Sequence, residues 1–60
     1  MIKMIFTVTV KTCEGNTEHN KFGREVAEGF AELAYCCENV YAVEVVNAET
    51  GEIIYYRAKG

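Results

Sequence analysis

The chain contains no proline, only three cysteines and one histidine, and its acidic residues are all glutamate. A proline-free composition that is 50% hydrophobic excludes a Pro-rich linker and a disordered tail. An odd number of cysteines argues against the disulfide framework of a small secreted protein. No apolar run approaches the roughly 18 residues of a membrane-spanning helix. The first residues alternate like a strand and do not resemble a signal peptide. We therefore expect a single cytoplasmic domain over residues 1–60.

Sequence motifs for catalysis are also missing. Gly15 and Gly51 stand alone and fall far short of a phosphate-binding loop. Glu25, Glu28 and Glu32 recur at helical spacing, but on the face predicted to be solvated. General acid catalysis needs a desolvated carboxyl group instead. We therefore expect no enzymatic activity, no catalytic residues and no cofactor.

One alternative function is a thiol or metal site formed by Cys13 and His19. Both residues lie in one predicted loop near the start of a helix. A thiol nucleophile needs a base within reach, and this pair supplies one. Cys36 and Cys37 are expected at the other end of the helix, about 24 Å away at ~1.5 Å per residue. Zinc ligands lie within about 2.3 Å of the metal, so the four residues are not expected to form a metal site.

Two segments before residue 40 have the periodicity of regular structure. Residues 2–11 alternate as a strand does, and the core face would carry Met4, Phe6, Val8 and Val10. Residues 13–20 are polar and are predicted to form a loop. A helix is predicted over about residues 20–37. Its core face would carry Phe22, Val26, Phe30, Leu33 and Cys37, with Gly29 beside them.

Residues 41–58 predict a β-hairpin around the turn that begins at Asn47 and contains Gly51. Asn47 can hydrogen-bond the backbone two residues on, and Gly51 accepts a positive φ. A three-residue loop would put charged side chains on both faces, whereas a four-residue loop leaves one face apolar. A one-residue change of register moves every side chain of a strand to the opposite face. The fully apolar face therefore favours the four-residue loop. Its pairs would be Asn47–Glu52, Val45–Ile54, Val43–Tyr56 and Tyr41–Ala58, with Tyr41, Val43, Val45, Ile54, Tyr56 and Ala58 on the core face.

Together these elements predict an α+β fold in the order β-α-β-β. One helix would pack on a three-stranded, fully antiparallel sheet. Residues 53–56 are apolar on both sides, as in a central strand, which favours the strand order 1-3-2. The alternative order, 1-2-3, makes the second strand central in a parallel βαβ unit.

The sheet face away from the helix is the predicted functional surface. Four of the six basic residues would lie there against one acid, while the helix would carry a row of glutamates. A small domain rarely leaves many apolar side chains uncovered on one face. The face would carry Lys3, Ile5, Thr7, Thr9, Lys11, Val40, Ala42, Glu44, Val46, Ile53, Tyr55, Arg57 and Lys59. The predicted partner-binding residues are Ile5, Val46, Ile53, Tyr55, Arg57 and Lys59.

These residues predict a non-enzymatic protein-interaction module. A chain of 60 residues is near the lower limit for folding alone, which favours a homodimer. The alternative is single-stranded nucleic acid stacked on Tyr55, with Arg57 and Lys59 as the cations. One aromatic side chain and a net charge of −3 make nucleic acid the less favoured partner.

In its length, its predicted β-α-β-β order and its closing segment over residues 43–56, VEVVNAETGEIIYY, the chain resembles small uncharacterised proteins of bacteria and their phages. The resemblance implies an accessory binding role, such as inhibition or modulation of a host protein. It assigns a role to no individual residue.

Overall fold

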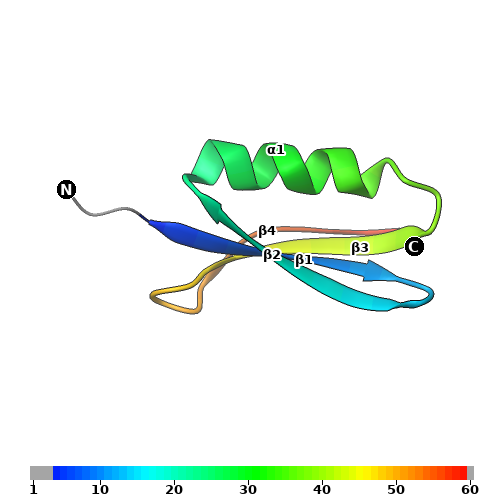
Figure 1. Ribbon diagram of the computed structural model, residues 1–60, viewed down its shortest axis with the longest axis horizontal. Coiled ribbons are helices and arrows are strands. Elements are labelled where there is room, and N and C mark those ends of the chain that lie inside the picture. Colours follow the sequence, from blue (N-terminus) through cyan, green and yellow to red (C-terminus); the bar gives the residue numbers. More distant parts are fainter. Residues whose placement is uncertain (1–3, 60) are drawn as a thin grey trace.

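The computed structural model describes residues 4–59, in which one helix lies across one face of a four-stranded antiparallel sheet (Figure 1). The strand order is β2-β1-β3-β4. The α+β class is therefore confirmed, but the prediction of three strands is wrong. The elements are β1 (Ile5–Thr12), β2 (Gly15–Phe22), α1 (Arg24–Tyr35), β3 (Val40–Asn47) and β4 (Ile53–Ala58).

Strand β2 occupies the segment that was predicted to be a loop. It pairs with β1 along its whole length, from Ile5 opposite Phe22 to Thr12 opposite Gly15. The Thr12 hydroxyl closes the turn, since it donates to the Gly15 carbonyl at 2.8 Å and accepts from the Glu14 N–H at 3.2 Å. Because β2 is an edge strand with mostly exposed polar residues, it lacks the apolar alternation from which a strand is predicted.

The extra strand also changes how the sheet is ordered. Because β2 runs antiparallel to β1, it ends beside the start of β1. Helix α1 then crosses to the other end of the sheet, and β3 pairs with β1 in the antiparallel direction. Strand β3 is therefore central and β4 lies at the edge. The predicted order with the last strand in the middle is wrong. The alternative placed the middle strand correctly but expected it to run parallel to β1.

Helix α1 packs on the sheet through alanines. Ala27 and Ala31 are fully buried, and Phe30 and Tyr35 pack beside them. The sheet supplies most of the large buried side chains, which are Phe6, Val8, Val10, Val43 and Val45, with Val40 near the end of the helix. Small helix residues allow the close approach that these branched side chains require.

Phe30 packs against the core as predicted, but the rest of the predicted core face of the helix is wrong. Val26 and Leu33 are 57% and 74% exposed, and Cys37 is exposed as well. Gly29 shares the exposed side, and a Cβ atom added there would meet nothing within 4 Å. Gly29 therefore has no part in the close packing between helix and sheet.

The β3–β4 hairpin has the predicted four-residue loop. The Asn47 N–H donates to the Glu52 carbonyl at 2.8 Å, and the Gly51 N–H donates to the Asn47 carbonyl at 2.7 Å. The Asn47 side chain caps the turn, since its Oδ1 accepts from the Glu49 N–H at 2.9 Å. Gly51 adopts the left-handed conformation with φ 79°.

Beyond the loop, a β-bulge shifts the register of β4. Val46 pairs with Ile53, but Val45 pairs with Tyr55, which leaves Ile54 as an extra residue. A bulge places two residues of one strand opposite a single residue of its partner. Both Ile54 and Tyr55 consequently pack against the core. The predicted pairs Val45–Ile54, Val43–Tyr56 and Tyr41–Ala58 are wrong, because the strands form Val45–Tyr55, Val43–Arg57 and Ala42–Ala58.

Gly23 connects β2 to α1 in a conformation that favours glycine, with φ 97°. We expect Gly23→Ala to lower the free energy of unfolding by about 1–2 kcal/mol, because a Cβ atom strains this backbone region. Gly29→Ala is the matched control in the same helix, and it should raise that free energy by up to about 1 kcal/mol. Neither added methyl group meets a neighbour within 4 Å. Urea denaturation measures the change in the free energy of unfolding for both variants. Equal changes would contradict the positive φ of Gly23.

Candidate functional site

The sheet face opposite the helix carries a contiguous group of apolar side chains near one end. Cross-strand pairing shows how they adjoin, because directly paired residues share a face. Ile5 pairs with Phe22, and one row further along Val46 lies between Thr7 and Ile53. Tyr56, opposite Glu44, extends the group along β4. We call it the open-face patch, and it consists of Ile5, Phe22, Val46, Ile53 and Tyr56.

Most of the open-face patch is accessible to solvent. Phe22, Ile53 and Tyr56 each expose more than half of their surface, Ile5 exposes 36%, and Val46 is half-buried. Exposed apolar side chains in a contiguous group are typical of an interaction surface, whereas single exposed ones are normal. The patch is therefore the candidate binding surface of the open sheet face.

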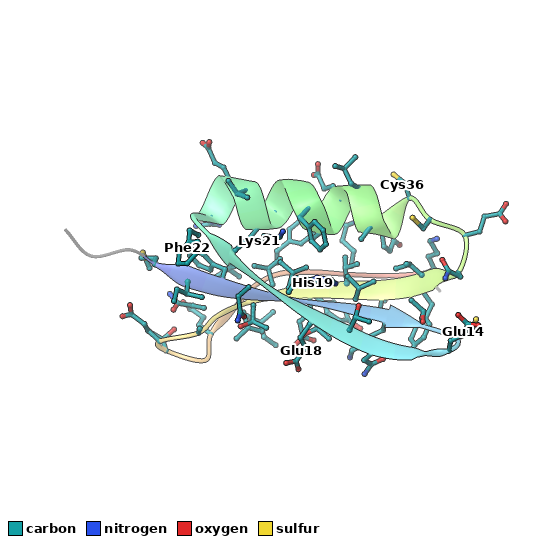
Figure 2. The ribbon with its side chains drawn as sticks, in the orientation of Figure 1. Glu14, Glu18, His19, Lys21, Phe22 and Cys36 are labelled. Atoms are coloured by element: carbon teal, nitrogen blue, oxygen red, sulfur yellow. The ribbon has the colours of Figure 1, made fainter. Side chains whose placement is uncertain are left out.

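Polar groups next to the open-face patch are partly neutralised within the sheet. Lys11 Nζ lies 3.8 Å from Glu44 Oε1, and the Thr7 hydroxyl donates to Asn20 Oδ1 at 3.1 Å. Glu18 projects from β2 on the side away from the helix (Figure 2). Among residues 4–59, Lys11 is the only cation on this face. The face is thus apolar with a weak negative charge.

Three of the six predicted binding residues do lie together on this face: Ile5, Val46 and Ile53. Tyr55, Arg57 and Lys59 lie on the helix side, so their predicted placement on the open face is wrong. The bulge at Ile54 is the cause, because it reverses the facing of every later residue of β4. Lys3, which was also assigned to the open face, lies outside the described residues.

Arg57 and Lys59, two cations predicted on the open face, both lie next to one aromatic ring at the end of the helix. The Arg57 guanidinium lies 4.6 Å and Lys59 Nζ 5.2 Å from the Tyr35 ring centroid. Lys59 Nζ also donates to the Cys37 carbonyl at 3.0 Å. A hydrogen bond with Tyr55 raises the pKa of the Arg57 guanidinium. These contacts tie β4 to the C-terminal end of α1 and remove both cations from the open face.

Phe22 and Tyr56 belong to the open-face patch although sequence reasoning placed both in the core. Phe22 was assigned to the helix, but it ends β2 and stands opposite Ile5. The position of Tyr56 depends on the bulge. Recognition of β2 as a strand would have located Phe22, since a hairpin with Cys13-Glu14 as its turn places it beside Ile5. Nothing in the sequence alone indicates the bulge.

Cys13 and His19 are not brought together as a thiol site. Cys13 lies in the turn between β1 and β2, and its N–H donates to the Asn39 carbonyl at 3.4 Å. The turn therefore lies beside the C-terminal end of the helix, not near its start as predicted. His19 lies within β2 and faces the helix (Figure 2). Its ring centroid is 4.8 Å from that of Phe30.

No metal-binding cluster is formed by the residues that the structure describes. Cys13, Cys36 and Cys37 are free and exposed. Lys21 Nζ lies 4.4 Å from the Phe30 ring centroid, so Phe30 contacts both His19 and Lys21 of β2. His19 thus has a packing role that needs no metal.

A second exposed apolar strip runs along the outer side of α1. It consists of Val26 and Leu33, with Gly29 between them. Glu25 and Glu32 are exposed on the same helix, and Arg24 is occupied by Glu28, whose Oε2 lies 2.7 Å from Arg24 Nε. This strip is narrower and more acidic than the open-face patch.

No family model, curated protein or solved structure matches the chain. Its function has to be inferred from its own residues. The helix in the described part of the chain is too short and too polar to cross a membrane.

Proposed function

We propose that the protein is a non-enzymatic interaction module that associates with a second copy of itself through the open-face patch. The observation that supports this is the group of five adjoining apolar side chains on a sheet face that the helix leaves uncovered. Two such faces in contact would remove these side chains from water. The apolar surface removed would be the main source of affinity.

The dimensions of the sheet set the size of the proposed interface. Three strands have eight residues, which at ~3.3 Å per residue span about 26 Å. Four strands at about 4.8 Å spacing add a width of about 19 Å. The flat footprint is thus on the order of 500 Å² before side-chain relief is counted, against roughly 800 Å² per partner in a stable complex. A twofold symmetric pair of these faces therefore corresponds to a small interface of the kind found in weak or transient complexes.

Charge supports a second copy as the partner. Lys11 and Glu44 neutralise each other on the open face, which leaves the weak negative charge of Glu18, so two faces would meet with only weak repulsion. The outer side of the helix is acidic and would repel its own copy. Nucleic acid is the weaker alternative, because Arg57 and Lys59 lie at Tyr35 on the other side of the sheet.

The test places a charge in the patch. Ile53→Glu should convert the dimer to a monomer, with at least about a hundredfold weaker association, because a desolvated carboxylate costs several kcal/mol. Val26→Glu is the matched control, since Val26 is 57% exposed and Ile53 is 55% exposed. Sedimentation velocity over a concentration series measures both variants.

Dissociation by Ile53→Glu with no effect of Val26→Glu supports the open-face dimer. Dissociation by Val26→Glu alone would move the interface to the helix. A wild-type chain that stays monomeric at high micromolar concentration would overturn self-association.

A further inference from the structure

A pocket of about 460 Å³ lies on the helix side of the sheet, where α1 begins and the β3–β4 loop ends. Its volume is within the range of small-molecule sites. It does not belong to the open-face patch, which lies across the sheet. The lining residues are Met4, Phe6, Gly23, Arg24, Asn47, Glu52 and Ile54.

The floor of the pocket is apolar. Met4 and Phe6 come from the start of the chain, and Ile54 comes from β4. Ile54 follows Ile53, which faces the open side, so it points to the helix side of the sheet and packs against the core. Phe6 is buried, whereas Met4 is partly open to solvent. The floor can therefore receive an aliphatic or aromatic group that enters from the open side.

Hydrogen-bond donors line one part of the pocket. Asn47 is only 7% exposed, and both hydrogen bonds of its side chain within residues 4–59 use Oδ1 as the acceptor. Its Nδ2 group takes part in neither bond, and because no buried side-chain nitrogen or oxygen of the described residues lacks a partner, this donor is open to solvent. Arg24 uses Nε for Glu28, which leaves its terminal nitrogens as donors. The start of α1 has no side-chain cap, so first-turn N–H groups add positive potential there.

Glu52 supplies a negative charge to the same pocket. Its carboxylate forms no ion pair with the described residues. The hydrogen bond with Glu28 raises the pKa of the Arg24 guanidinium, and the charge of Glu52 adds to that shift. Arg24 and Glu52 both line the pocket, which therefore offers one group to an anion and one to a cation beside its apolar floor.

We propose that this pocket binds a small zwitterion with an apolar side group, the chemistry of an apolar α-amino acid. The ligand carboxylate meets Arg24 and the Asn47 amide. The ligand ammonium meets Glu52, and the apolar group packs on Met4, Phe6 and Ile54. A simple anion would be repelled by Glu52, and a simple cation would leave the donors unsatisfied, so both are weaker ligands.

The experiment is a titration of the intact chain with L-leucine at low salt, followed by backbone amide NMR. We expect saturable shifts at Phe6, Gly23, Asn47 and Ile54. Two analogues each lack one head group: 4-methylpentanoate has no ammonium and 3-methylbutylamine has no carboxylate. Each should bind at least about tenfold more weakly, the loss expected for one charge-assisted hydrogen bond.

Two variants test the assigned contacts. Glu52→Gln should weaken leucine about tenfold and leave 4-methylpentanoate unchanged or tighter, and Arg24→Gln should weaken both. Glu49→Gln, in the same loop but outside the pocket lining, is the matched control and should change neither. The dispersion of the spectra reports folding of every variant.

Saturable leucine shifts that depend on Glu52 and Arg24 support the proposal. An absence of shifts at millimolar leucine would overturn it, as would shifts confined to the open face. Equal binding of leucine and 4-methylpentanoate would also overturn it, because the ammonium would then have no partner.

Discussion

Val45→Asp is expected to leave the chain unfolded. Val45 is fully buried in the central strand β3, with Val8 opposite it on one side and Tyr55 on the other. The substitution removes about 1.5–3 kcal/mol of apolar burial and places a carboxylate without a partner in the core, which costs several kcal/mol more. A domain of 60 residues has a total stability of only about 3–9 kcal/mol at ~0.05–0.15 kcal/mol per residue.

Val46→Asp is the matched control one residue along the same strand. Its side chain lies on the open face, where the carboxylate stays hydrated. We expect it to fold, with a loss below about 1 kcal/mol from strand propensity. Circular dichroism and amide NMR dispersion distinguish the outcomes. A folded Val45→Asp chain would contradict the assigned faces of β3.

The second large effect concerns the two adjacent tyrosines of β4. Tyr55→Ala should lower the free energy of unfolding by about 2–3 kcal/mol, because the Tyr55 ring packs against the core on the helix side. Tyr56→Ala should lower it by less than about 1 kcal/mol in the monomer, since Tyr56 is more than half exposed on the open face. Urea unfolding at low protein concentration measures both without a contribution from association.

This pair decides between a bulged and a regular β4 strand. In a regular hairpin Tyr56 would oppose Val43 in the core and Tyr55 would face outward, so the two losses would be exchanged. The alanine variants have the same composition, which makes each the control for the other. A greater loss for Tyr56→Ala would contradict the bulge at Ile54.

Several local features could be predicted because short-range chemistry determines them. The alternation identified β1, and the structure confirms Phe6, Val8 and Val10 on its core face, whereas Met4, also predicted there, precedes the strand and is 46% exposed. Asn47 and Gly51 indicated the hairpin turn and its four-residue length, since an Asn side chain and a positive φ at Gly close such a loop. A helix in the middle of the chain was also predicted correctly.

Features that depend on distant partners could not be read from periodicity. Strand β2 is held by hydrogen bonds to β1 and needs few apolar side chains of its own. The alanines of the helix face the sheet, whose valines already fill the core. Val26 and Leu33 therefore lie on the exposed side of the helix. Helical spacing alone assigns the largest apolar residues to the core, which is incorrect here.

The sequence by itself determined the α+β class, the first strand and the turn of the last hairpin, because these depend on side chains and backbone preferences within a few residues. Tertiary structure alone decided the faces of β4. A regular strand would place Ile54 and Tyr56 inward, but the bulge lets Ile54 and Tyr55 both pack against the core. That single extra residue moved Tyr55, Arg57 and Lys59 to the helix side and brought Tyr56 to the open face.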